Sequence, residues 1–265
     1  MKTKNRLTIA IVQTKLYWED VKANKRKITR TLDTIAKKTD IIFLPEMFNS
    51  GFSMNVKKTS ETMDGETVTW LKSEAKKRSI CLVGSIAVLE KEKYFNRLLW
   101  VDKDGNINYY DKRHTFTMAG EDKVFSKGKK TQIIHFNGWK FFPQVCYDLR
   151  FPVWSRNIHD YDVVFYLANW PSARADAWDI LLRARAIENV SYCLGVNIVG
   201  EDPKNNKYVG RSCVVDPEGK KISLGLNEKE GVIIVELKKD ILKKARTKFK
   251  FLKDRDEFTF LNQNS

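Results

Sequence analysis

The stretch from Trp139 to Pro152, WKFFPQVCYDLRFP, constrains the fold more than any other part of the chain. Its first half, Trp139 to Val145, is apolar and aromatic, which is typical of a buried strand. Cys146 follows at once, and Pro152 then opens a short amphipathic segment, since proline is tolerated in the first turn of a helix. This pattern predicts a strand, a tight turn and a helix, with a thiol at the corner where backbone N–H groups and the helix dipole favour a thiolate. A small buried cysteine is the alternative interpretation.

Apolar runs and turn signals predict the order of the remaining elements. Strands are expected over residues 7–13, 40–44, 80–90, 95–101, 107–112, 132–136, 163–168, 193–199, 212–216 and 232–237. Helices are expected over 19–38, 66–78 and 176–192 and in the tail from 238, with a loop over 51–64. Strands alternate with helices early and late, and hairpins occupy the middle. An α/β fold of two mixed sheets that face each other, with helices outside both, accounts for this order as one domain over residues 1–265.

The cysteines and the hydropathy pattern indicate the cellular compartment in which the protein is expected. Cys81, Cys146, Cys193 and Cys213 are far apart and form no C-x-x-C pair, so neither a zinc site nor a redox dithiol is expected. Three of them lie in apolar runs, as reduced core residues of a cytoplasmic protein do. The apolar run from Leu7 to Val12 is too short for a signal peptide, and no run reaches the length of a membrane span. We therefore expect a cytoplasmic protein with no membrane partner.

The net charge of +15, from 48 basic and 33 acidic residues, is high enough for nucleic acid binding to be considered. The positions of the charges argue against it. Lys22, Lys25 and Arg26 share a segment with apolar residues at helical spacing, and lysines surround Ile241 and Leu242 in the same way. These patterns are typical of the solvated faces of amphipathic helices, so no nucleic acid partner is expected. Steering of anionic ligands is the remaining use of such charge.

Three of the predicted apolar strands end at a chemically reactive side chain. The strand over 40–44 leads to Glu46, the strand over 107–112 ends at Lys112, and the Trp139 strand ends next to Cys146. Reacting groups collect at one end of the strands in layered α/β folds. The thiol suits a nucleophile, the carboxylate a general base with a pKa raised by burial, and the ammonium a partner for a developing oxyanion. Taken singly, Glu46 could cap a helix, Lys112 could lie on the surface and Cys146 could be a core residue.

Three separated motifs resemble those of the nitrilase superfamily of carbon–nitrogen hydrolases, and they occur in the family's order. Leu44-Pro-Glu-Met-Phe48 is similar to the glutamate motif, Tyr110-Asp-Lys-Arg-His-Thr-Phe116 to the lysine motif, and Val145-Cys-Tyr-Asp-Leu-Arg-Phe-Pro152 to the cysteine motif. Further similarities lie at Gln13, Asn169–Pro171 and Arg183–Asn189. The resemblance thus covers nearly the whole chain.

Within this family the chain resembles the omega-amidase branch most, through the segments Glu46–Phe52, Arg113–Glu121 and Arg150–Asn157. The resemblance implies a four-layer α-β-β-α sandwich, a homodimer, and no metal ion or organic cofactor. It also implies hydrolysis of the terminal amide of 2-oxoglutaramate or 2-oxosuccinamate to the 2-oxo acid and ammonia. Asp111 departs from the pattern, because many relatives carry a basic residue before the lysine. That difference leaves Lys112 in place but weakens any inference about the electrostatic field around it.

The resemblance further implies a role for each matched residue. Cys146 attacks the amide carbon and forms a thioester, while Glu46 accepts the thiol proton, helps deliver it to the departing ammonia and then activates water. Lys112, with the backbone N–H of Tyr147, holds the tetrahedral oxyanion. Glu121 is similar to the family's second glutamate, which orients the lysine. A loop charge beside an aspartate is the alternative interpretation of Glu121.

The implied substrate needs a cationic partner for its remaining carboxylate, ideally an arginine that donates two parallel hydrogen bonds. Arg174, which lies shortly after a predicted strand, is the first choice. Arg150 is the second, although it could instead hold the turn after the nucleophile. Phe116 and Trp170 are candidates for the walls of the pocket, although aromatic residues at this density are often core residues.

Three other functions stay open on the sequence. A cysteine peptidase would pair Cys146 with His114 or His159, but neither histidine ends a strand run. A non-enzymatic basic binding protein would need aromatic residues interleaved with lysines on one surface, whereas the aromatic residues here lie in apolar strands. The third possibility keeps the fold and the triad and changes the substrate to another small amide, an N-carbamoyl compound or a nitrile.

Overall fold

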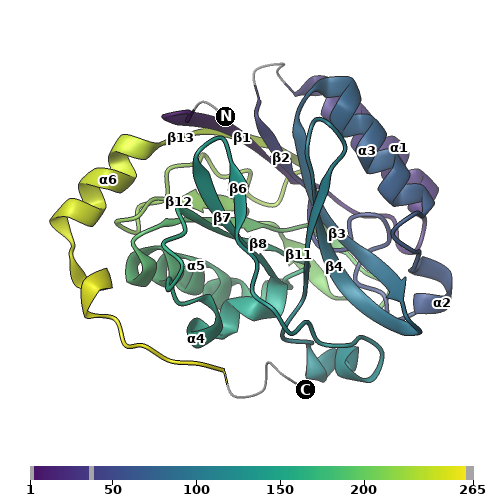
Figure 1. Cartoon of the computed structure of the whole chain (residues 1–265). Coiled ribbons are helices and arrows are strands. Elements are labelled where there is room, and N and C mark those ends of the chain that lie inside the picture. Colours follow the sequence, from purple (N-terminus) through teal and green to yellow (C-terminus); the bar gives the residue numbers. More distant parts are fainter. Residues whose placement is uncertain (1–2, 36–38, 261–265) are drawn as a thin grey trace.

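The computed structural model describes residues 3–35 and 39–260, whose strands form two main sheets and one small hairpin (Figure 1). The first sheet has the order β13-β1-β2-β3-β4-β5 and the second the order β12-β9-β8-β7-β6. The strands of the first sheet are β1 (Arg6–Gln13), β2 (Ile41–Phe43), β3 (Cys81–Glu90), β4 (Lys93–Val101), β5 (Ile107–Asp111) and β13 (Gly231–Lys238). Those of the second are β6 (Ile134–Phe136), β7 (Trp139–Val145), β8 (Val163–Leu167), β9 (Tyr192–Val196) and β12 (Cys213–Val215). The hairpin consists of β10 (Val199–Glu201) and β11 (Lys207–Val209).

Both sheets are mixed, as the sequence predicted. β1, β2 and β3 run parallel, and so do β7, β8 and β9, because intervening helices carry the chain back between them. The remaining strands run antiparallel to their neighbours. The β6–β7 turn has positive φ at both Asn137 (48°) and Gly138 (80°), as a type I′ hairpin requires. The parallel β7–β8 pair places the cysteine strand beside the strand that leads to Arg174.

The strands bury side chains on both faces of each sheet. Between the sheets, Phe43, Trp100, Phe141 and Phe165 pack with ring centroids 4.9 to 6.4 Å apart. The outer faces are covered by helices, which are α1 (Val21–Thr34) and α3 (Glu66–Arg78) on the first sheet and α5 (Ala175–Asn189) on the second (Figure 1). The architecture is therefore the four-layer α-β-β-α sandwich that the resemblance implied.

Local chemistry sets two helix ends that the hydropathy pattern misplaced. α1 begins two residues later than predicted, because the side chain of Asp20 caps it by accepting a hydrogen bond from the backbone N–H of Ala23 (2.9 Å). It ends at Thr34, and residues 36–38 of the predicted helix lie outside the described residues. α5 ends before the predicted residue 192, because Val190 takes a left-handed conformation (φ 41°) that closes the helix.

Several short elements differ from the prediction. α2 (Val56–Thr59) lies inside the predicted loop, and β10 and β11 lie where one longer strand and an irregular segment were expected. α4 (Pro152–Ser155) begins at the predicted proline but is only four residues long. α6 (Lys239–Lys248) is the predicted tail helix, at the periphery of the molecule (Figure 1). No helix within residues 3–35 and 39–260 is long and apolar enough to span a bilayer.

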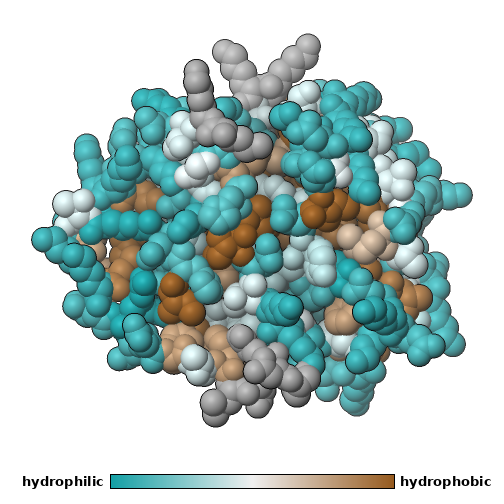
Figure 2. Space-filling model, in the orientation of Figure 1, coloured by the Kyte–Doolittle hydropathy of each residue, from teal (hydrophilic) through white to brown (hydrophobic). Residues whose placement is uncertain are grey.

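The basic residues are distributed over the surface and often have acidic neighbours. The face shown in Figure 2 is mainly hydrophilic, with hydrophobic residues in separate patches. On α1, Lys25 forms an ion pair with Glu66 of α3 at 2.8 Å, and Lys27 forms one with Glu230. Part of the positive charge of α1 is therefore neutralised locally rather than presented as one basic face.

Candidate active site

Three strand ends meet between the two sheets. Glu46 lies just beyond β2, Lys112 directly follows β5 and Cys146 directly follows β7. Glu46 and Lys112 are 0% and 1% exposed, whereas Cys146 is partly exposed. Because β2 and β5 belong to the first sheet and β7 to the second, residues from both sheets build one site.

Lys112 lies between two carboxylates. Its Nζ donates to Glu46 Oε1 at 2.9 Å and to Oε1 and Oε2 of Glu121 at 3.0 and 2.9 Å. Glu121 follows a short 3-10 turn of residues 117–119 and is fully buried. Glu121 is therefore a buried partner of Lys112 and not a loop charge in solvent.

Amide and backbone donors complete the hydrogen bonding of both carboxylates. Asn96 Nδ2 donates to Glu46 Oε1 at 2.8 Å and to Glu121 Oε1 at 3.2 Å. The backbone N–H of Asn169 donates to Glu46 Oε2 at 2.8 Å, and that of Phe116 donates to Glu121 Oε2 at 2.6 Å. Within the described residues, three of the four carboxylate oxygens accept two hydrogen bonds each. The fourth, Glu46 Oε2, accepts one.

Cys146 lies at a sharp backbone corner. Its φ of 43° is left-handed, a conformation that few residues other than glycine adopt. Strand, turn and helix follow one another in the predicted order, because a 3-10 turn over Cys146–Arg150 lies between β7 and the short α4. Asp148 holds this turn by accepting hydrogen bonds from the backbone N–H groups of Val145 (3.0 Å) and His114 (2.9 Å).

Burial and neighbouring charges set the protonation of the site. Burial raises the pKa of Cys146 well above its ordinary value, and the negative charge of Glu46 adds to the rise. Burial also raises the pKa of Glu121, against the opposing charge of Lys112. Burial alone would lower the pKa of Lys112, but Glu121 and Glu46 outweigh this effect and raise it. At neutral pH the site thus holds the ammonium of Lys112 and the uncharged thiol of Cys146. The sequence predicted a thiolate instead. A reaction at this thiol therefore needs a base.

Cys146 opens into a cavity of about 260 Å³. The lining includes Tyr147 and all four residues predicted to contact substrate, namely Phe116, Arg150, Trp170 and Arg174. Apolar walls come from Trp18, Phe52, Met54 and Met118. The β10–β11 hairpin contributes Asp202, Lys204, Asn206 and Tyr208. A largely apolar cavity with a few convergent polar groups is the usual form of a small-molecule site.

Aromatic rings hold both arginines at the cavity. The guanidinium carbon of Arg174 lies 5.1 Å from the ring centroid of Phe116, and that of Arg150 lies 5.0 Å from that of Trp170. An aromatic face attracts a cation without neutralising its charge. The ion pairs that arginines form among the described residues involve only Arg6, Arg78, Arg97, Arg185, Arg211, Arg246 and Arg255. Both cavity arginines therefore keep their charge available for an anionic ligand.

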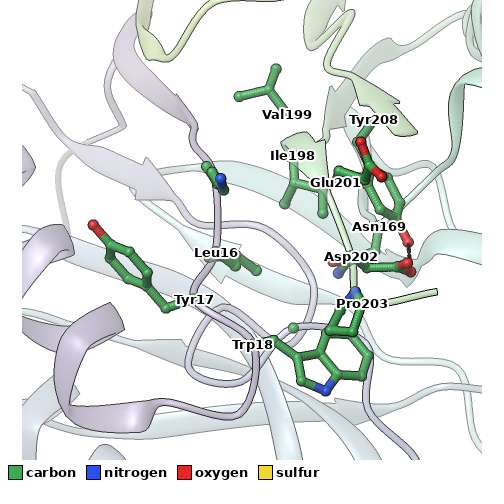
Figure 3. A pocket seen from close by; sticks show the side chains of 12 residues that line it. Leu16, Tyr17, Trp18, Asn169, Ile198, Val199, Glu201, Asp202, Pro203 and Tyr208 are labelled. Carbon is green, nitrogen blue, oxygen red and sulfur yellow. Dashed lines mark hydrogen bonds between the residues drawn. The ribbon is translucent and has the colours of Figure 1, made fainter. Parts of the chain in front are cut away.

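A second cavity, of about 350 Å³, adjoins the first (Figure 3). The two cavities share Trp18, Asn169, Asp202 and Tyr208 among their lining residues. In this shared wall the phenol of Tyr208 donates to Asp202 Oδ2 at 3.0 Å, the dashed line in Figure 3. Asn169 therefore borders both cavities while its backbone holds Glu46.

The histidines of the peptidase alternative bond elsewhere. His114 Nδ1 lies 2.7 Å from Asp148 Oδ1, and its ring stacks on Phe151 with centroids 3.7 Å apart. His159 is not among the residues that line the cavity of Cys146. His114 thus fixes the turn that follows Cys146, and this geometry argues against a cysteine–histidine pair.

Sequence reasoning missed several polar residues at the site. Asn96 and Ser85 are buried side chains in apolar strands, which is a signal in itself because a buried polar group needs a partner. Asn169 was noted only as part of a motif, although its backbone and side chain both bond to Glu46. Lys204 carried no signal, because only the hairpin brings it to the cavity.

Comparisons with known proteins agree with this geometry. The family model described as carbon-nitrogen hydrolase matches residues 8–247. The chain is 40% identical over 255 residues to omega-amidase YafV of Yersinia enterocolitica, covering 96% of this chain and 99% of that protein. It is 32% identical over 235 residues to 2-oxoglutaramate amidase of Bacillus subtilis, covering 87% and 90%. The crystal structure of XC1258, a CN-hydrolase superfamily protein from Xanthomonas campestris, matches with a TM-score of 0.94 and 38% identity, over 97% of this chain and 100% of that chain.

These similarities cover the region that carries the site. Residues 8–247 include Glu46, Lys112, Glu121 and Cys146 and the lining residues of both cavities. The chain therefore belongs to the carbon-nitrogen hydrolase family, the nitrilase superfamily that its three motifs predicted.

Proposed function

We propose that the protein is an omega-amidase, which hydrolyses the terminal amide of 2-oxoglutaramate or 2-oxosuccinamate to the 2-oxo acid and ammonia. The observation that carries this proposal is the pair of available arginines, Arg150 and Arg174, in the cavity of Cys146. The scissile amide is neutral, so recognition has to come from the other end of the molecule, where these substrates carry a carboxylate. The relatives named omega-amidase and 2-oxoglutaramate amidase support the same substrate class.

In this proposal Cys146 is the nucleophile and Glu46 is its base. Glu46 Oε2 accepts only the N–H of Asn169 among the described residues, so it has a lone pair free for the thiol proton. The sulfur attacks the amide carbon as Glu46 takes that proton, and a C–S bond forms. The C–N bond then breaks, and Glu46 returns the proton to the departing ammonia. The product of this half-reaction is a thioester on Cys146.

Lys112 and the backbone N–H of Tyr147 stabilise the tetrahedral oxyanion. Lys112 donates to Glu46 and to both oxygens of Glu121. When one N–H is shared between the two oxygens of Glu121, another is free to reach the oxyanion. The raised pKa of Lys112 keeps the ammonium charged throughout, so it supplies positive charge and no proton.

Water then hydrolyses the thioester. Glu46 takes a proton from the water as it attacks the thioester carbon, the C–S bond breaks, and the sulfur recovers its proton. Both oxygens of Glu121 already accept two hydrogen bonds, so this carboxylate positions Lys112 and takes no proton. The cycle needs no metal ion or organic cofactor, because Cys146, Glu46 and Lys112 supply the nucleophile, the base and the charge.

Arg174 binds the distal carboxylate of the substrate, with Arg150 as the second cation. Each guanidinium lies over an aromatic wall residue, Phe116 or Trp170, which restricts its motion. A planar guanidinium donates two parallel hydrogen bonds to a carboxylate, so its orientation selects the substrate's direction in the cavity.

We also propose that the chain works as one domain in a cytoplasmic homodimer. One core cluster contains residues of both sheets, which favours a single folding unit. Ile180 and Ile187 are 66% and 44% exposed on α5, two helical turns apart, and a second copy would cover such a face. The buried free thiols of Cys81, Cys193 and Cys213 fit a reducing compartment.

Ammonia release over a panel of substrates tests the proposed reaction. The panel contains 2-oxoglutaramate, glutamine, asparagine, N-carbamoyl-β-alanine and simple nitriles, with Cys146→Ala as the inactive control. The highest kcat/KM is expected for 2-oxoglutaramate. A preference for the N-carbamoyl compound or a nitrile would keep the family assignment and overturn the proposed substrate.

A further inference from the structure

We propose that Asn96 is a positioning residue that determines which carboxylate oxygen of the site acts as the base. Asn96 lies on β4, is 1% exposed and does not line the cavity of Cys146. This inference rests on the proposed function and extends it, because it assigns the proton transfer to one atom, Glu46 Oε2.

A ring of hydrogen bonds connects Glu46 with the backbone of the next residue. The backbone N–H of Met47 donates to Ser85 Oγ at 2.9 Å, and Ser85 Oγ donates to Asn96 Oδ1 at 2.9 Å. Asn96 Nδ2 then donates to Glu46 Oε1 at 2.8 Å. Met47 has a positive φ of 44°, which is strained for a residue with a side chain and needs such support. The glutamate side chain is thus tied to its own backbone through β3 and β4.

Chemistry fixes the direction of each bond in this ring. A backbone N–H can only donate, so the hydroxyl oxygen of Ser85 accepts from Met47 and its proton points to Asn96. The amide oxygen of Asn96 accepts that proton, and its NH2 group therefore faces Glu46 and Glu121. A flipped amide would place its oxygen against two carboxylates, which is repulsive.

Asn96 acts differently on the two glutamates. On Glu46 its N–H occupies Oε1, which Lys112 also contacts, and Oε2 keeps room for the proton of Cys146. On Glu121 it gives Oε1 a second donor, and with Lys112 and the backbone of Phe116 both oxygens are then filled. One amide group therefore distinguishes the carboxylate that takes a proton from the carboxylate that only holds Lys112.

The same contact favours the charged form of Glu46. Hydrogen bonds donated to a buried carboxylate stabilise its ionised form, and Asn96 supplies one of three donors to Glu46. Loss of Asn96 is therefore expected to lower kcat and to move the acidic limb of the pH–rate profile upward, with little effect on substrate binding.

Three variants of the ring test this proposal beside a matched control. Asn96→Leu removes the hydrogen-bond donor to Glu46, and Asn96→Asp adds a third carboxylate to the site. Ser85→Ala removes the hydroxyl group that fixes the orientation of the Asn96 amide. The control is Asn157→Leu, because Asn157 is fully buried and bonds through its side chain to Tyr161 and Asn189, outside both cavities. Two readouts are measured against pH: steady-state kcat and KM, and the rate of Cys146 alkylation by iodoacetamide. The alkylation rate needs no substrate, so it reports on Glu46 and Cys146 even if the proposed substrate is wrong.

Asn96→Leu is expected to lower kcat about 10–100-fold, because a misplaced base loses its reactive geometry, with KM changed less than about threefold. Both pH profiles should move upward by about one unit. Ser85→Ala should move both pH profiles in the same direction, but by less than Asn96→Leu does. Asn96→Asp should lose more activity than Asn96→Leu. Asn157→Leu should lower stability without moving either pH profile. Unchanged profiles in a folded Asn96→Leu protein would overturn the proposal, as would the same shift in Asn157→Leu. If Asn96→Leu does not fold, an unmoved alkylation profile in Ser85→Ala decides against it.

Discussion

The two sides of the candidate site, a buried polar cluster and the open cavity of Cys146, are built in different ways. On one side, Glu46, Lys112, Glu121 and Asn96 are at most 1% exposed and bond to one another at 2.8 to 3.2 Å. On the other side, the partly exposed Arg150 and Arg174 lie over aromatic rings, and the hairpin adds the exposed Lys204. The first side leaves few hydrogen-bonding positions open, whereas the second presents charges to a ligand.

Under the proposed function, this difference assigns reaction and specificity to separable parts of the molecule. The buried cluster fixes reacting atoms to within a hydrogen-bond length, as catalysis of a single type of bond requires. The arginine wall has no structural ion pair to lose among the described residues, so substitutions there can change the substrate and leave the fold intact. Variants on the two sides should therefore differ in how they divide their effects between activity and stability.

Replacement of the proposed nucleophile should have the largest effect on activity and almost none on stability. Cys146→Ala is expected to lower kcat by about ten thousand-fold or more, since Cys146 is the one thiol of the described residues that lines the cavity. The free energy of unfolding should change by less than about 1 kcal/mol, because the side chain is small and partly exposed. Ammonia release and denaturant unfolding measure the two effects, and substantial residual turnover would place the nucleophile elsewhere.

Removal of the buried ammonium should damage both activity and stability. Lys112→Met leaves Glu46 and Glu121 buried without their cation, which should cost about 3–5 kcal/mol of unfolding free energy and lower kcat by about a thousand-fold. Burial raises the pKa of Glu121, so the folded variant binds more protons than the unfolded chain, and its stability should fall as pH rises above about 4.5. The exposed Lys58, which pairs with Glu19, provides the control variant Lys58→Met. Equal stability of the two variants would contradict the buried cluster.

Loss of the first-choice arginine should change specificity more than stability. Arg174→Ala is expected to reduce kcat/KM for 2-oxoglutaramate by an amount equivalent to about 2–4 kcal/mol, because the substrate carboxylate then lacks its partner. Activity on a small uncharged amide should fall far less. An equal loss on both substrates would show that Arg174 is structural, and Arg150 would then be the next arginine to test.

The reactivity of the four thiols tests whether Glu46 acts as a base. Burial raises the pKa of Cys81 and Cys213 to about 12 and places that of Cys193 well above its ordinary value. The pKa of Cys146 is raised as well, but Cys146 is the one cysteine of the four that is partly exposed, so it should react with iodoacetamide before the other three, at a rate that rises with pH. Glu46→Gln should lower kcat by about a hundredfold or more, because the uncharged thiol then has no base. Equal labelling of all four thiols in native protein would count against the assigned nucleophile.

Patterns local in sequence could predict most of the fold. The apolar runs gave the strands that lead to Glu46, Lys112 and Cys146, and α3 has the bounds that were predicted for it, Glu66–Arg78. The β10–β11 hairpin was missed, because its strands are three residues long and lie partly in solvent, so they lack an apolar pattern.

The rest of the site depends on contacts between distant residues. Asn96 reaches Glu46 only because β3 and β4 pair in a register that sets Ser85 and Asn96 on one side of the sheet. The uncharged state of Cys146 follows from burial and from Glu46, which lies 100 positions earlier in the chain. Sequence motifs predicted Glu46, Lys112 and Cys146 as the reacting residues, while tertiary packing determines the protonation of Lys112 and Cys146.

Removal of the second arginine should have the smallest effect on stability, and it sharpens the contrast with Lys112. Arg150 contacts Trp170 through one cation–π interaction and has no ion pair among the described residues. Such a contact contributes about 0.5–1 kcal/mol at a partly exposed position, so Arg150→Ala should lower the free energy of unfolding by about that amount. Denaturant unfolding of Arg150→Ala beside Lys112→Met measures the difference directly. A loss from Arg150→Ala as large as that from Lys112→Met would show that Arg150 is a structural residue that holds the turn after Cys146. The buried cluster and the arginine wall would then not be separable.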